Sequence, residues 1–231
     1  MTQTIKNTIF ALAATFVFAA AAHAQGFTSS SFSSSWESSS SSSWGMNADG
    51  TTFRNGQQSS SSKTSASATT GTVTPFGVSS DTTSFNQEQA QSSGFSQSNG
   101  PGGFSQNAFN NNSGSTSLVN QRRNSGLFGN STDTRSISSQ FSNQNSMSQG
   151  IGSNGIFDNR IQRNTGSTTV GRNITANIVF GPSIQAGSTR TVGFDNTQGL
   201  NTGLNSGGLF QNAFNSQNVT AGGTDFFNIL P

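Results

Sequence analysis

The chain lacks the residue types on which most catalytic and metal sites depend. Among its 231 residues there is no cysteine and only one histidine, His23. Without cysteine, neither a disulfide framework nor a thiolate metal site is available. His23 lies in an N-terminal segment that we expect to be removed, so the mature chain would have no imidazole for acid–base catalysis or zinc binding. We predict no catalytic, cofactor-binding or metal-binding residue, and no enzyme activity.

Charged and apolar residues are both scarce. Charged residues make up 8% of the chain and hydrophobic residues, with glycine not counted, 29%. With the 27 glycines added, the apolar share is still below the roughly 45–50% of globular proteins. A conventional hydrophobic core is therefore not expected. An uncharged polar chain of this kind stays disordered or assembles through backbone pairing, with little charge to keep copies apart. The composition predicts a largely disordered, low-complexity chain with a β-rich C-terminal part.

Basic residues are too dispersed to indicate a nucleic-acid site. Only Arg122-Arg123 and the group of Arg160, Arg163 and Arg172 approach a basic patch. No nucleic-acid-binding motif surrounds either group, which favours a solvated surface. We predict no nucleic-acid partner.

The N-terminus has the layout of a secretion signal. Lys6 is followed by a nearly unbroken apolar run over residues 9–22, which is too short to span a bilayer. A small-x-small site, Ala22-His23-Ala24, comes directly before Gln25. The pattern predicts a short helical signal peptide over residues 1–24, cleaved between Ala24 and Gln25. We expect a bacterial protein that is secreted or held at the cell surface or in the periplasm, with no membrane span after cleavage.

A serine-rich tract occupies residues 25–68. Twelve of the fifteen residues from 29 to 43 are serine. Such a tract buries too little apolar surface to offset its ordering entropy, which predicts flexibility. Trp36 and Trp44 interrupt it, and a tryptophan ring offers a large flat face that can stack on a sugar. These two residues are candidates for glycan stacking; the alternative is a linker with incidental aromatics.

Asparagine, glutamine, glycine and isolated phenylalanine dominate residues 69–150. Asn99-Gly100-Pro101-Gly102 is a strong turn signal in this region. Helices are not expected, because no 3.6-residue apolar period is present and good helix formers do not occur in runs.

The most strand-like region covers residues 151–231. The segments 168–170 and 174–180 are rich in β-branched residues and end at Gly181-Pro182, and 189–194 is a second strand candidate. With 185–188 as a turn, they predict a β-hairpin. An isolated hairpin is marginal in water, so it needs a sheet neighbour from this chain or from another copy. Hairpins, an irregular β-solenoid and a cross-β arrangement formed on assembly all remain open.

A degenerate unit, Gly-Leu/Ile-Phe-x-Asn, occurs at residues 126–130, 155–159 and 208–212, and residues 102–110 match 207–215 at seven of nine positions. The units start 29 and 53 residues apart, which predicts dispersed contact points without a fixed period. Phenylalanine supplies an apolar face, and asparagine can stack into hydrogen-bonded ladders. The predicted self-association residues are Phe128, Phe157, Phe210, Phe214, Asn130, Asn159 and Asn212.

Together these features favour an exported, non-catalytic structural protein that self-associates in a β-rich fibre, biofilm matrix or cell-surface adhesive layer. In composition alone the chain resembles the curli-type bacterial functional amyloids, whose alternating Gln, Gly and Asn pattern aligns with no stretch here. The alternative is a largely disordered secreted protein that binds polysaccharide or a surface partner through its aromatics. A third hypothesis is a small C-terminal β domain on a disordered stalk, with the apolar segment 225–231 as its anchor.

Overall fold

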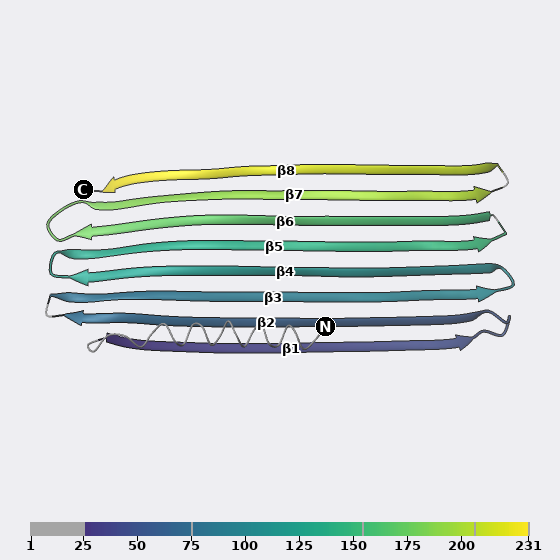
Figure 1. Ribbon diagram of the computed structural model, residues 1–231, viewed down its shortest axis with the longest axis horizontal. Coiled ribbons are helices and arrows are strands. Elements are labelled where there is room, and N and C mark those ends of the chain that lie inside the picture. The colour runs from purple at the N-terminus through teal and green to yellow at the C-terminus, as the bar shows by residue number, and fades with distance from the viewer. Residues whose placement is uncertain (1–25, 75, 154, 206, 231) are drawn as a thin grey trace.

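The computed structural model describes residues 26–74, 76–153, 155–205 and 207–230, and nearly all of them lie in eight long strands. Figure 1 shows the strands side by side in one layer. They are β1 (Gly26–Met46), β2 (Thr52–Thr74), β3 (Gly77–Gly100), β4 (Gly103–Gly126), β5 (Gly129–Gly152), β6 (Gly155–Ile178), β7 (Ser183–Asn205) and β8 (Gly208–Leu230).

Each strand pairs antiparallel with the strand that follows it in the chain, so the sheet is a simple meander in the order β1 to β8. Pairing is unbroken along each strand; β3 and β4, for example, pair from Gly77↔Gly126 to Gly100↔Gly103. At about 3.3 Å per residue, a strand of 24 residues is about 80 Å long. The backbone groups of the inner strands are thereby satisfied along their whole length.

Glycines mark the turns at a fixed interval. Gly103, Gly129 and Gly155 start successive strands 26 residues apart, with φ angles of 122°, 139° and 120°. A side chain at any of them would meet a backbone carbonyl of the next strand, so both conformation and space call for glycine. The prediction of repetition without a fixed period is therefore wrong. The interval was hidden because the units compared lie at different ends of the strands.

The expectation of a largely disordered chain is also wrong. The serine-rich tract forms β1 and most of β2, and residues 69–150 contribute to β2, β3, β4 and β5. Order in these segments comes from continuous backbone pairing and from small side chains that fit between neighbouring strands, and not from apolar burial. The zone limits at residues 68 and 150 fall inside β2 and β5 and do not coincide with strand ends.

The predicted C-terminal hairpin exists with a different turn. Val170 pairs with Arg190 and Thr169 with Thr191, between β6 and β7. The turn lies at residues 179–182, and the predicted turn at 185–188 is inside β7. The Gly100-Pro101-Gly102 signal does mark the turn between β3 and β4. The predicted signal peptide, residues 1–24, and its cleavage site between Ala24 and Gln25 lie outside the described residues.

No apolar side chain in the described part of the chain is buried. Several of the buried positions are instead glycines that lie directly opposite a phenylalanine: Gly56, Gly94, Gly150 and Gly203. The architecture is a single-layer sheet with both faces uncovered, and its closest packing is between neighbouring strands.

Candidate assembly surfaces

Residues that oppose one another across successive strands form columns that run the whole width of the sheet. We name each column by its residue in β1. Directly paired residues in an antiparallel sheet point to the same face, and successive residues along a strand point to opposite faces. The columns therefore sort into two faces with different chemistry.

Apolar side chains are concentrated on the face that carries the Phe32 and Met46 columns, which we call the amide face because amide columns lie between them. The Phe32 column consists of Phe32, Ala66, Phe85, Leu118, Ile137, Val170, Arg190 and Gly223. The Met46 column continues from Phe104 with Ile151, Ile156, Leu204 and Leu209. Each forms an exposed apolar row across several strands.

Side-chain amides form rows on the same face. The Ser38 column contains Gln91, Asn112, Asn143, Asn164, Asn196 and Gln217 in succession. The Ser40 column contains Asn110, Asn145, Gln162, Gln198 and Asn215. The Oδ1 atoms of Asn143 and Asn196 are buried and have no hydrogen-bond partner. Because these two oxygens are enclosed by the structure, they are not accessible acceptors for another molecule.

The opposite face, which we call the hydroxyl face, carries serine and threonine in its central columns. The Ser33 column consists of Ser33, Ser65, Asn86, Ser117, Ser138, Thr169, Thr191 and Gly222. Some of these hydroxyls bond across strands; Ser33 and Ser65 are 2.6 Å apart, and Thr169 and Thr191 3.0 Å. Small hydrated side chains give this face little apolar surface at its centre.

Phenylalanine rings lie over glycines of the neighbouring strand on both faces. On the amide face, Phe141 lies between Gly114 and Gly166, and Gly166 is in turn opposite Phe194. A Cβ atom added to Gly166 would lie 2.5 Å from Phe194 Cε1. An aromatic ring over a glycine covers the exposed backbone and fixes the alignment of the two strands. These pairs recur across the sheet and account for its register.

The two ends of the sheet also differ. The turns after β2, β4 and β6 carry Phe76, Phe128 and Phe180, spaced 52 residues apart and 72%, 84% and 105% exposed. Successive turns are linked, because Leu127 N donates to Phe76 O at 3.3 Å and Val179 N donates to Phe128 O at 3.2 Å. We call this the Phe-turn end. The turns at the opposite end are rich in glycine, serine and asparagine.

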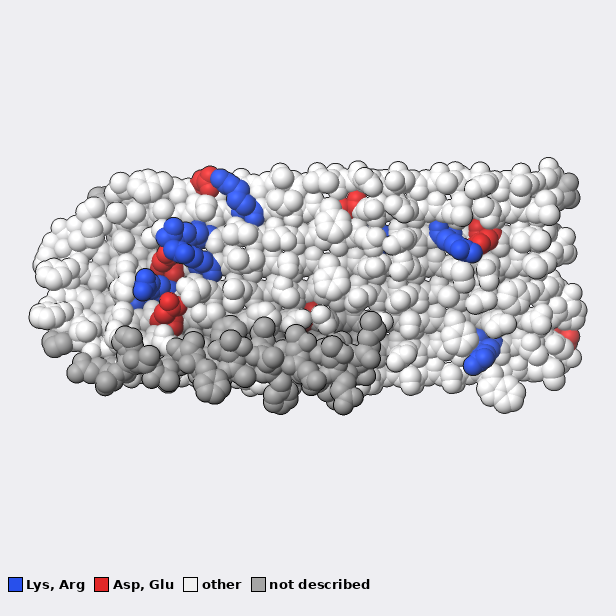
Figure 2. Space-filling view, in the orientation of Figure 1, with Lys and Arg blue, Asp and Glu red and all other residues white. Residues whose placement is uncertain are grey.

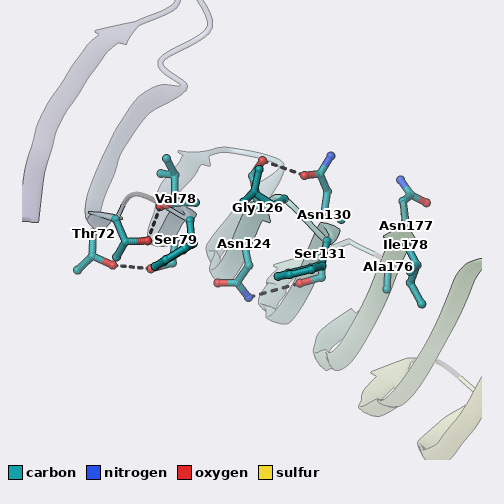
Figure 3. A pocket seen from close by; sticks show the side chains of 17 residues that line it. Thr72, Val78, Ser79, Asn124, Gly126, Asn130, Ser131, Ala176, Asn177 and Ile178 are labelled. Carbon is teal, nitrogen blue, oxygen red and sulfur yellow. Dashed lines mark hydrogen bonds between the residues drawn. The ribbon is translucent and has the colours of Figure 1, made fainter. Parts of the chain in front are cut away.

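A shallow hollow lies at the Phe-turn end, between the rows of polar side chains and the turns. Figure 3 shows Thr72 bonded to Ser79, and Asn124 to Ser131, within it. The hydrogen-bonded atoms are 2.7 Å and 3.4 Å apart. Because the side chains along the hollow already pair with one another, it is part of the repeating surface and has no separate set of convergent polar groups.

Charged side chains are few and mostly paired. Figure 2 shows them gathered at a few places on a largely uncharged face. Arg172 bonds Asp133 through two nitrogens, at 3.0 and 2.8 Å, and these hydrogen bonds hold the pKa of Asp133 below its ordinary value. A hydrogen bond from Arg163 likewise lowers the pKa of Asp195. Exposed pairs of this kind contribute little to stability.

The predicted basic groups do not form patches. Arg122 and Arg123 are adjacent in β4 and so point to opposite faces, and Arg160 bonds Asp158. The absence of a nucleic-acid partner stays a prediction, which this arrangement favours.

Two of the three predicted repeat units come together, and the third does not. Phe157 and Phe210 lie in one column on either side of Gly203, and Asn159 and Asn212 share another with Asn201. Phe214 is opposite Gly199. Phe128 and Asn130 lie at the Phe-turn end, remote from the rest. The sequence analysis did not identify the glycines that lie opposite these phenylalanines. The feature that could have indicated them is the many glycines spaced along segments that also carry phenylalanine.

Trp36 and Trp44 lie on the edge strand β1 and point to the amide face, where they are 60% and 86% exposed. Eight residues of strand separate them, a distance of about 26 Å. Trp44 is opposite Arg54 and Trp36 is opposite Ser62. The two rings are thus accessible from the same side.

No known protein-family model matches the chain, and a comparison with curated proteins finds no match. Within the part of the chain that the structure describes, no helix is long and apolar enough to cross a membrane. The same residues contain no group of three or more His, Cys, Asp or Glu side chains that could hold a metal ion. The fold is a regular β-rich one, compatible with a structural protein.

Proposed function

We propose that this chain is an exported, non-catalytic structural protein that self-associates into a β-rich fibre or surface layer, such as a biofilm matrix or an adhesive coat. The observation that carries the proposal is the single-layer sheet with no buried apolar side chain among its described residues. Such a sheet leaves large apolar side chains exposed in rows, and contiguous exposed apolar patches mark association sites. Association with further copies removes that surface from water.

The edges of the sheet support the same function. β1 and β8 are the outermost strands, and each has one side without a strand partner among the described residues. A long, uncharged edge strand is a template for pairing with another chain. Proteins that stay monomeric shorten such edges or place lysine or proline on them; the only charged residue of β1 is Glu37 and the only one of β8 is Asp225.

Self-association is tested with purified residues 25–231 at micromolar concentration. We expect a β-type far-UV circular dichroism spectrum and a sedimenting fraction that grows over days, with a fixed soluble concentration left at the end. A chain that stays monomeric and soluble at every concentration would contradict the proposal.

Export is a separate part of the proposal and has its own test. The full chain, expressed in a bacterium, should appear outside the cytoplasm, and its mass should be that of a chain whose first residue is Gln25. Replacement of Ala22 and Ala24 by bulky residues should leave the segment 1–24 attached. Protein of unchanged mass in the cytoplasm would refute export by a cleaved signal.

One observation favours polysaccharide binding as a second function. Trp36 and Trp44 are exposed on one face of one strand, where sugar rings can stack on them. Replacement of both by alanine should abolish retention on immobilised glycan and leave sedimentation largely intact, whereas unchanged retention would exclude these two residues from glycan binding.

A further inference from the structure

We propose that the partner of this sheet is a second copy of the same chain, and that β8 of one copy pairs antiparallel with β1 of the next, with Phe32 opposite Gly223 and Gly45 opposite Phe210. The inference rests on the proposed function of self-association. It adds which edges meet and in which register.

The directions of the two edge strands permit this contact. β1 and β8 lie at the two margins of the sheet and run in opposite directions (Figure 1). A copy placed beside β8 in the same orientation therefore presents its β1 antiparallel to β8, so the alternation of strand directions continues across the boundary. The contact uses different surfaces on the two copies and leaves a free edge at each end, so it produces an open filament.

The ends of the columns match by the rule that holds inside the sheet. The column that begins at Phe32 ends at Gly223, and the column that begins at Gly45 ends at Phe210. If a second copy continues the columns, its Phe32 lies opposite Gly223 and its Gly45 lies opposite Phe210. Both contacts place a phenylalanine directly opposite a glycine, as Phe157 is opposite Gly203 inside the sheet. Within one copy the ring of Phe53 lies over Gly45, that of Phe210 over Gly203 and the Arg190 side chain over Gly223. Edge pairing therefore continues the residue order of the columns and does not place a new ring over an uncovered glycine.

Apolar residues meet at two further columns of the same boundary. The column that starts at Trp36 ends at Val219, and the column that starts at Met46 ends at Leu209. All four of these side chains are exposed at the sheet edges. Continuation of the columns would cover them with apolar partners, which is the expected gain from edge pairing.

Charge does not oppose the contact. Glu37 is the only charged residue of β1 and Asp225 the only one of β8. In the continued columns, Glu37 lies opposite Asn218 and Asp225 lies opposite Ser30. The two carboxylates are seven columns apart and point to opposite faces.

Other registers are poorer. A shift of two residues in either direction places Phe32 opposite Ala221 or Asp225 and loses both pairs of phenylalanine with glycine. A shift of four residues pairs Gly45 with Phe214 and Trp36 with Gly223. That register displaces the Phe-turn end of one copy from that of the next by about 13 Å and interrupts every column. It is the competing arrangement that the experiment must distinguish.

Disulfide trapping tests the register, because the chain has no cysteine of its own. Ser34 and Ala221 are the two ends of one column, on opposite edges of a single molecule. Seven strand spacings separate them, about 33 Å, so a disulfide between them within one copy is impossible. In the proposed contact, cysteines at these positions face each other between copies, with Cα atoms about 4.5–5.5 Å apart.

The double variant S34C/A221C is assembled under reducing conditions and then oxidised. We expect a ladder of covalent multimers on a non-reducing gel, which collapses to monomer when reductant is added. In the matched control S38C/A221C the first cysteine lies four residues further along β1, so the two cysteines face each other only in the register shifted by four residues. This control should give no ladder. A second pair, S35C/T220C, tests the adjacent column, because only one of two neighbouring columns has the closer spacing of a non-hydrogen-bonded pair.

Sedimentation of each variant before oxidation separates this inference from the proposed function. Assembly with a ladder from S34C/A221C or S35C/T220C supports the inference. Assembly with a ladder from S38C/A221C, with dimers from a single-cysteine variant, or with no ladder from any pair overturns it and leaves self-association standing. Failure of the unmodified chain to assemble contradicts both.

Discussion

On the amide face of the sheet, the Phe32 and Met46 columns carry apolar side chains from strand to strand, with amide rows between them. On the hydroxyl face, the central Ser33 column is almost entirely serine and threonine. Both faces belong to the same strands and share the same backbone pairing. The amide face therefore offers the longer apolar rows on which another sheet could pack, whereas the hydroxyl face is polar at its centre and carries Phe157, Phe210 and Phe214 towards the glycine-rich turns.

The largest effect is expected from a charge placed in the Phe32 column of the amide face. Ile137→Asp puts a carboxylate between Leu118 and Val170, whereas Ser136→Asp puts one on the hydroxyl face of the same strand. Where another sheet packs on the amide face, this carboxylate would be buried without a partner, at a cost of about 1–3 kcal/mol. We expect the soluble concentration left after assembly to rise about tenfold for Ile137→Asp, since about 1.4 kcal/mol is a factor of ten.

Sedimentation followed by absorbance of the supernatant gives this concentration. The Ser136→Asp variant should change it by less than about threefold. Equal effects of the two variants would mean that the faces are not energetically different.

A smaller effect is expected from filling the space beneath a phenylalanine. An alanine at Gly166 would bring its Cβ to 2.5 Å from the ring of Phe194 and force that ring to move. Overpacking of this kind costs roughly 1–3 kcal/mol per site, at the lower end where a side chain can rotate away. Gly222, on the hydroxyl face of β8, has nothing within 4 Å of an added Cβ.

Urea-induced loss of the β signal measures the difference. Gly166→Ala should lower the midpoint, while Gly222→Ala should leave it unchanged or raise it slightly because alanine restricts the unfolded chain. A lower midpoint for Gly222→Ala alone would refute the role assigned to phenylalanine–glycine pairs in stability.

A third prediction concerns the amide rows. Asn164→Asp keeps the shape of the side chain and places a carboxylate between Asn143 and Asn196, whose Oδ1 atoms are already without partners. Hydrogen-bond acceptors then face one another along the row, so assembly should be slower at pH 7. Assembly should recover near pH 3, where the new carboxyl is protonated. The matched variant Ser167→Asp, on the hydroxyl face of the same strand, should show the weaker dependence on pH in a turbidity time course.

The smallest effect is expected from the natural ion pairs. Arg172 lowers the pKa of Asp133, so the folded state binds the proton less tightly than the unfolded state does. This contribution to stability is present above the ordinary carboxyl pKa of about 4 and is lost as the pH falls through the folded value. Asp133→Asn should reduce the decrease in urea midpoint between pH 6 and pH 2, and an unchanged decrease would exclude this pair as a contributor.

Part of the fold could be predicted from the sequence. The glycine-rich turn after β3 and the pairing of residues 168–170 with the 189–194 segment followed from turn residues and β-branched side chains. The strands β1 and β2 could not be predicted in the same way, because serine has no strong preference for strands. Whether these two strands become ordered depends on the residues paired across them, such as Gly71 opposite Phe27 and Ala66 opposite Phe32 and Phe85.

The candidate surface was also predicted only in part. Phe157, Phe210, Asn159 and Asn212 were selected from repeated units, and the structure brings them together. The columns that organise each face were missed, because the sequence separation between residues on neighbouring strands alternates; from Phe32 to Ala66 it is 34 residues and from Ala66 to Phe85 it is 19. A search for glycines at intervals of 26 residues would have located the turns and, with them, the pairing register.

Fibre diffraction from aligned material of residues 25–231 shows whether the sheet grows through its edge strands. We expect a meridional reflection near 4.7–4.8 Å, because the strands run across the fibre and the sheet extends along it by pairing of β8 with β1. A diffuse pattern without this reflection, or a 4.7–4.8 Å reflection on the equator, would contradict growth of the sheet through its edges.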